Sequence, residues 1–212
     1  MFGRLEIFIS AVPAVIITTS LHEIVKSIVA CKYSGKPKQN RISFNPFIYM
    51  DPLGTIFLLF FGFGWSKPTS FAPNEFTNPK KTFMLIFFIP FITHLIIAFT
   101  MFYIYELLIF NQLISLVTAS RFDIYGLILN SLQMIIIYNL TFATMSILPI
   151  HPFNGINLLA AYSPITATKI ASIEGFFQAI IILIIVFGFA EIIIYSPVTN
   201  FLHQLSLYFR SS

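Results

Sequence analysis

Residues 83–110 read FMLIFFIPFITHLIIAFTMFYIYELLIF, a run of 28 residues in which Glu106 is the one charged side chain. About 20 apolar residues are enough for an α-helix to cross the hydrocarbon core of a bilayer. Three further runs have similar length and composition, namely Leu5–Ala30, Ile124–Leu148 and Phe176–Tyr195. The sequence therefore predicts an all-α polytopic membrane protein with about four transmembrane helices in the lipid bilayer.

The composition of the 212-residue chain supports a membrane protein. Hydrophobic residues make up 57% of the chain and charged residues 9%, and the mean hydropathy is +0.87. Soluble domains carry about 25% charged residues, so this composition strongly disfavours a water-soluble protein. The net charge of +4 comes from 12 scattered cations without a basic helix, which argues against a nucleic-acid partner. One cysteine, Cys31, excludes an internal disulfide framework.

A fifth apolar run, Leu53–Trp65, has only 13 residues and is too short to span easily. We expect a re-entrant or strand-like segment there, with its backbone covered by protein. After the last span, residues 198–209 are expected to form a short amphipathic surface helix. Because no repeat or linker divides the chain, residues 1–212 are expected to form one membrane-embedded domain.

The distribution of lysine and arginine predicts the orientation. If the fifth run is re-entrant, one side of the membrane carries eight cations and the other carries three. The eight are Lys32, Lys36, Lys38, Arg41, Lys67, Lys80, Lys81 and Lys169. Cytoplasmic loops are enriched in such residues, so we expect the N-terminus outside and the basic loops between residues 32 and 81 in the cytosol.

The first predicted span contains His22, Glu23 and Lys26 within the sequence SLHEIVK at 20–26. Ionisable side chains inside a membrane mark a functional site by default. Residues three and four apart share a helix face, which brings Lys26 near both His22 and Glu23. One alternative is a buried ion pair that fixes the helix register. The other is a relative of the His-Glu-x-x-His arrangement, in which two histidines bind zinc and the glutamate activates a water.

Four later stretches favour the second alternative. They are residues 45–55 (NPFIYMDPLGT), 63–68 (FGWSKP), 78–81 (NPKK) and 148–155 (LPIHPFNG). Together with His22-Glu23 they resemble, in order and spacing over residues 21–155, the site-2 protease family in its compact bacterial branch. The resemblance implies an intramembrane zinc endopeptidase core. Such enzymes cut transmembrane segments near the cytosolic face.

Carried over residue by residue, the resemblance implies His22 as a zinc ligand and Glu23 as the general base. Lys26 stands at the second ligand position and Asn154 at the third, where the family has His and Asp. Zinc sites need about three ligands from His, Cys or carboxylate, so we expect zinc to be absent or weakly bound. The Lys⁺–Glu⁻ pair sums to zero charge, as the intact zinc site does. Lys26 is therefore expected to pair with Glu23 in place of the ion.

Three other polar residues bear on this prediction. His151 is an alternative ligand in a relocated metal site with His22 and Glu23, or else a loop residue that faces the headgroups. His94 and Asn139 lie within predicted spans and are expected to form hydrogen bonds between helices.

Three functions follow as alternatives. The favoured one is a catalytically impaired or inactive homologue that binds or regulates transmembrane substrates or partners. The second is an active zinc-dependent intramembrane metalloendopeptidase. The third is a transporter in which His22, Glu23 and Lys26 relay protons.

Overall fold

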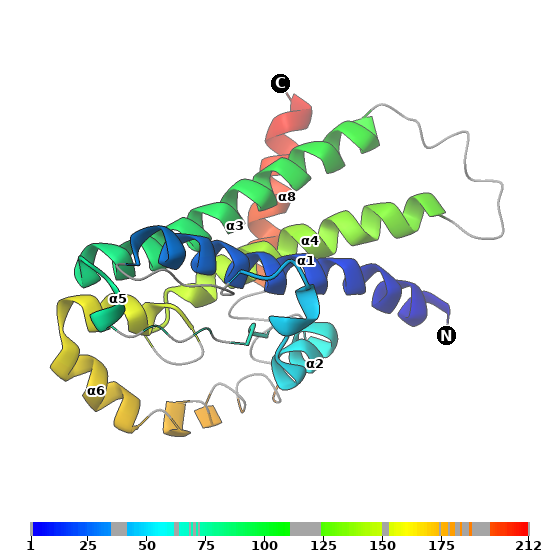
Figure 1. Cartoon of the computed structure of the whole chain (residues 1–212). Coiled ribbons are helices and arrows are strands. Elements are labelled where there is room, and N and C mark those ends of the chain that lie inside the picture. Colours follow the sequence, from blue (N-terminus) through cyan, green and yellow to red (C-terminus); the bar gives the residue numbers. More distant parts are fainter. Residues whose placement is uncertain are drawn as a thin grey trace.

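In its described part the computed structural model is mostly helical, with two isolated β-bridges and no strand (Figure 1). The described residues are 2–34, 42–61, 64–67, 69, 71, 73–110, 124–149, 153–173, 175–177, 179–180, 183, 187 and 196–211. Most of the expected fourth span, 176–195, and all of His151 lie outside them.

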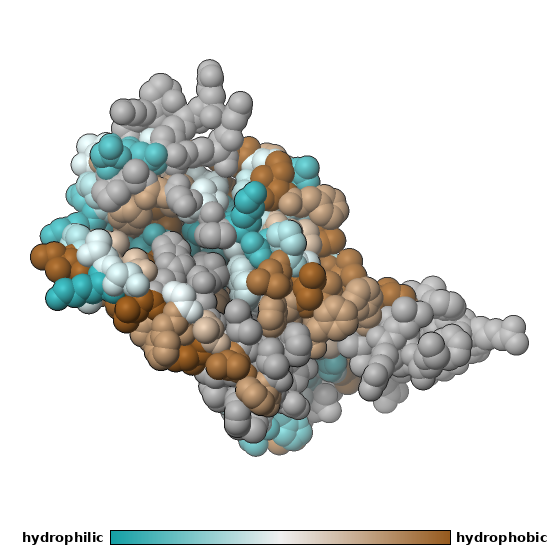
Figure 2. All heavy atoms as spheres, turned by 90° about the horizontal axis from the view of Figure 1, so that it is seen from below, coloured by the Kyte–Doolittle hydropathy of each residue, from teal (hydrophilic) through white to brown (hydrophobic). Residues whose placement is uncertain are grey.

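Three long helices form the bundle: α1 (Phe2–Tyr33), α3 (Pro79–Phe110) and α4 (Ile124–Ser146). In Figure 1, α1 and α4 run antiparallel to α3. Within the described residues these three helices are long and apolar enough to cross a membrane. Large hydrophobic side chains are exposed on the bundle, and they gather in broad areas of the face seen in Figure 2. Such a surface suits lipid rather than water, so the prediction of a membrane protein is supported.

The first nine residues of the fifth apolar run, together with Pro52 before them, form the helix α2 (Pro52–Phe61). The strand-like alternative is therefore wrong here, and the adjoining Met50 and Ser66 form only an isolated bridge. Asp51 accepts a hydrogen bond from Gly54 N at 2.8 Å, and Pro52 supplies a helical φ at the first position, so a helix starts at this point. Ten residues rise about 15 Å, about half of the hydrocarbon core.

The chain around α2 enters and leaves at the same end of the bundle. Leu58 of α2 packs in one cluster with Ala11 and Val15 of α1, well along the bundle. The chain then returns, and Phe76 bridges to Ser34 just after the end of α1. This path is the one that the re-entrant alternative requires. It also places Lys32 and the start of α3, with Lys80 and Lys81, at one end of the bundle.

Short helices complete the fold. The 3-10 turns η1 (Pro46–Ile48) and η2 (Pro73–Glu75) flank α2, and α5 (Gly155–Tyr162) and α6 (Pro164–Ser172) follow α4. The last helix, α8 (Ser196–Ser211), covers the range expected for an amphipathic helix and extends two residues beyond it at each end. Its residues Val198, Leu202 and Leu205 pack on α3 and α4.

Three glycines of the sequence motifs lie where no side chain fits. A Cβ at Gly64 would lie 2.1 Å from the carbonyl oxygen of Gly54, and a Cβ at Gly54 would lie 2.2 Å from that of Trp65. A Cβ at Gly155 would lie 2.3 Å from Ile147 O. These glycines let the returning segment and the start of α5 approach the bundle closely.

Replacing Gly64 with Ala should therefore destabilise the protein by about 1–3 kcal/mol, because the backbone must move to admit the methyl group. The control is Gly175→Ala, since a Cβ there meets nothing within 4 Å. Thermal unfolding of the two variants in the same detergent checks the prediction. Equal melting temperatures would contradict the close approach.

Candidate functional site

The structure brings together the four residues that the sequence places at the site. His22, Glu23 and Lys26 lie on α1, and Asn154 lies directly before α5. His22 is 6% exposed, and the other three are each 1% exposed. A buried polar group is costly unless it is hydrogen-bonded, so the partners of each side chain decide what the cluster can do.

Both carboxylate oxygens of Glu23 accept hydrogen bonds. Oε1 accepts from Lys26 Nζ at 2.9 Å and from Ser66 Oγ at 2.9 Å. Oε2 accepts from the backbone N of Thr69 at 3.1 Å. The predicted pair of Lys26 with Glu23 is thus present. The ammonium therefore lies directly on the carboxylate and occupies one side of Oε1.

A chain of hydrogen bonds runs from Asn154 through His22 into the bundle. His22 Nε2 lies 2.9 Å from Asn154 Nδ2, and His22 Nδ1 lies 2.8 Å from His94 Nε2. On its other side, His94 Nδ1 lies 2.7 Å from Asn139 Oδ1. The expectation that His94 and Asn139 hydrogen-bond between helices is confirmed.

The contacts of Asn139 determine which atom donates and which accepts in each of these hydrogen bonds. Asn139 Nδ2 donates to Thr18 Oγ1 at 3.0 Å and to Ile135 O at 2.8 Å, so Asn139 Oδ1 must accept from His94. With its proton on Nδ1, a neutral His94 accepts at Nε2 from His22. With its own proton on Nδ1, a neutral His22 accepts at Nε2 from the Asn154 amide.

This direction leaves His22 without a free lone pair. The Nε2 lone pair, the atom through which His22 would bind a metal, already accepts from Asn154 Nδ2. Turning the Asn154 amide over would place two acceptors against each other unless His22 changed tautomer. A change of tautomer would in turn break the bond to His94. Only one set of amide orientations and histidine tautomers therefore allows all of these side-chain hydrogen bonds to form.

The donor set around His22 does not fit zinc. It consists of one imidazole engaged by an amide, one carboxylate engaged by an ammonium, and the amide oxygen of Asn154. Among the described residues, no group of three or more His, Cys, Asp or Glu side chains could hold a metal ion. The Asn154 oxygen is buried without a hydrogen-bond partner there, but a neutral amide oxygen is a poor zinc ligand. His151, the alternative ligand, lies outside the described residues.

The hydrogen-bond chain should contribute to stability. Replacing Asn139 with Leu removes the acceptor of His94 and a donor to Thr18, which should cost about 1–2 kcal/mol. Gln133→Leu on the same helix is the control, because the Gln133 bond to Tyr105 is exposed. Unfolding of both variants in detergent measures the difference. An Asn139 variant as stable as the control would show that the buried chain is energetically neutral.

Sequence reasoning did not anticipate the roles of Ser66 and Thr69. Both lie more than 40 residues from Glu23 and reach it through the segment that returns from α2. The stretch at 63–68 matches a motif of the family that the sequence resembles. No local feature indicated that Ser66 would hydrogen-bond to the carboxylate.

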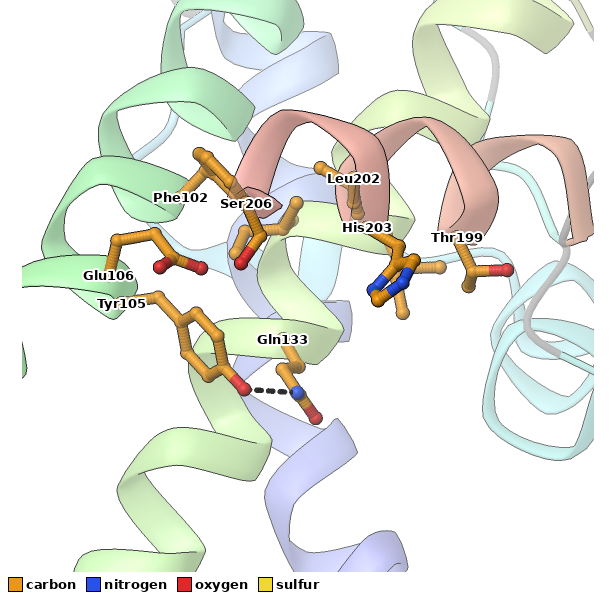
Figure 3. A pocket seen from close by; sticks show the side chains of 10 residues that line it. Phe102, Tyr105, Glu106, Gln133, Thr199, Leu202, His203 and Ser206 are labelled. Carbon is orange, nitrogen blue, oxygen red and sulfur yellow. Dashed lines mark hydrogen bonds between the residues drawn. The ribbon is translucent and has the colours of Figure 1, made fainter. Parts of the chain in front are cut away.

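A second set of polar side chains lines a cavity of about 350 Å³ between α3, α4 and α8 (Figure 3). Its lining includes Glu106, Gln133 and His203, and Gln133 Nε2 donates to Tyr105 OH at 2.6 Å. Glu106 lies 12 residues after His94 on α3, about 18 Å along the helix. This cavity is therefore separate from the cluster around His22.

Comparison with known proteins gives one informative similarity. The chain is 33% identical over 95 residues to the Bacillus subtilis (strain 168) protein described as "Putative zinc metalloprotease YwhC". The match covers 44% of this chain and 43% of the relative, so the chain matches less than half the length of that protein. No family model matches the chain, and no solved structure matches it. The chain is thus a helical membrane protein that is similar, over part of its length, to a protein described under that name.

Proposed function

We propose that the chain is a site-2-protease-like membrane protein without a catalytic metal, which binds or regulates transmembrane segments. One observation supports this most strongly. The Lys26 ammonium contacts Glu23 at 2.9 Å, where the family would have a zinc ligand and a free base. Removing one partner of a buried ion pair is costly, so Lys26 is held beside Glu23, and a single histidine whose Nε2 already accepts a hydrogen bond does not retain zinc.

The scaffold around the cluster is held by contacts that do not involve a metal. Motif residues start helices, as Asp51 does for α2 and Asn78 does for α3, where Asn78 Oδ1 accepts from Lys81 N at 3.2 Å. Motif glycines permit the close approach of Gly54 and Gly64. These features place Ser66 and Thr69 against Glu23 of α1. They depend on backbone geometry, so they persist without a metal.

In this proposal the protein resides in a bacterial cell membrane with its N-terminus outside. The bundle end that carries Lys32, Lys80 and Lys81 then faces the cytosol, in keeping with the excess of cations in cytoplasmic loops. The cluster around Glu23 lies nearer that end. Partners are transmembrane segments that enter from the bilayer.

Metal content and cleavage test the proposal together. Protein purified without chelators should contain only trace zinc and should leave a model transmembrane substrate intact. Photo-crosslinking in membranes should capture a transmembrane partner equally in the native protein and in Glu23→Gln. Stoichiometric zinc, or cleavage abolished by Glu23→Gln, would establish the active metalloendopeptidase instead.

A further inference from the structure

A large apolar cavity opens between the start of α3 and the pair α5 and α6. Its volume is about 720 Å³, within the range of small-molecule sites. Its walls are mostly small or apolar side chains, including Phe83, Ile156, Ala160, Ala161, Ala167 and Ala171. None of the residues of the His22–Glu23 cluster lines it.

Cations gather beside this cavity. Lys80 lines it, and Lys81 follows in the first turn of α3. The Lys81 Nζ lies 5.8 Å from the centre of the Tyr33 ring, and Lys32 Nζ lies 5.9 Å from the same ring. Tyr33 packs in one hydrophobic cluster with Phe83 and Ala161 of the cavity wall, so the Lys81 and Lys32 ammonium groups lie close to the cavity that Lys80 lines. Lysines at a helix N-terminus face the positive end of the helix dipole, an arrangement that a nearby anion stabilises.

The position along the bundle matches the headgroup level of a membrane. The 32 residues of α3 rise about 48 Å, which exceeds the hydrocarbon thickness of about 30 Å. The first turn of α3 therefore lies at or near the headgroups. The neighbouring α5 and α6 expose Tyr162 and Ile165, at 62% and 72%, beside the cavity. An occupant thus meets cations at one end and apolar walls at the other.

We infer that this cavity binds an anionic phospholipid. Its phosphate would interact with Lys80 and Lys81, and an acyl chain would lie against the alanines of α5 and α6. Apolar walls with a cationic rim complement both parts of such a lipid, and basic pockets at membrane surfaces select anionic headgroups. The lipid site does not depend on whether the chain cleaves substrates.

Lipid retention tests this inference on the full chain. Protein reconstituted with equal amounts of phosphatidylglycerol and phosphatidylcholine, then extracted in detergent, should retain phosphatidylglycerol in native mass spectra. The double variant Lys80→Gln with Lys81→Gln should bind phosphatidylglycerol roughly tenfold more weakly. Lys67→Gln, an exposed cation that does not line the cavity, is the matched control and should behave as the native protein.

A second variant tests the apolar half. Ala171 is exposed at the cavity, so Ala171→Trp narrows the space without entering the packed core. It should reduce retention of phosphatidylglycerol while leaving the melting temperature unchanged in detergent without lipid. Equal retention of both lipids, no effect of the lysine variants, or a protein rather than a lipid adduct from a photo-crosslinker at Thr168 would each overturn the inference.

Discussion

The double variant Lys26→His with Asn154→Asp should bind stoichiometric zinc, whereas the native protein should contain only trace amounts. Histidine at position 26 lies one helical turn from His22, on the same face of α1. Aspartate at position 154 would replace the amide that now lies 2.9 Å from His22 Nε2. The site then offers two imidazoles and a carboxylate, the ligand set of a catalytic zinc centre.

Each single variant should bind zinc weakly. Lys26→His alone leaves the Asn154 amide against His22, and Asn154→Asp alone leaves the ammonium against Glu23. Metal analysis after dialysis against buffer with micromolar zinc measures all four proteins. His94 remains available to orient His22 through Nδ1, as metal-binding histidines require.

Adding Glu23→Gln to the double variant is the internal control. This variant should retain zinc, because the general base of the family is not a ligand, and it should not cleave a substrate. If the double variant takes up no zinc, the assignment of positions 26 and 154 as ligand positions is wrong. If the native protein takes up as much zinc as the double variant, the proposal of a metal-free site fails.

The contacts between site residues on the same helix were predictable from their spacing in the sequence. The three-residue interval between Glu23 and Lys26 fixes them on one face of a helix, and the structure pairs them. The composition of the long apolar runs likewise predicted the three helices that can span a membrane. In both cases the determining interactions are local, so the sequence alone is enough.

Contacts between distant segments were not predictable in the same way. Polar residues in transmembrane helices tend to bond across helices, so His94 and Asn139 were expected to find partners. Which partners they find depends on helix rotation and register, and His22 lies 72 residues from His94. The 53–65 run was ambiguous because short apolar runs suit helix and strand alike. The helix-start signal of Asp51 and Pro52 favours a helix over a strand at residues 52–61.

The Lys26–Glu23 pair should also dominate the stability of the site. Lys26→Met removes the ammonium and leaves a carboxylate that is 1% exposed with only two neutral hydrogen-bond donors. Breaking a buried ion pair by removing one partner costs about 3–5 kcal/mol, so the variant should unfold at a much lower temperature or denaturant concentration. Unfolding in mixed micelles measures the change in free energy.

The combination of Lys26→Met with Glu23→Gln should restore most of this loss. The amide of glutamine still accepts from Ser66, and no charge remains buried, so replacing both partners is nearly neutral. The two single variants and the double variant form a cycle, and the coupling energy isolates the pair from its surroundings. Lys67→Met is the matched control, because this exposed lysine should change stability by no more than about 0.5 kcal/mol. A Lys26→Met variant as stable as this control would show that Glu23 does not depend on the ammonium. The interpretation of Lys26 as the replacement for a metal ion would then lose its physical basis.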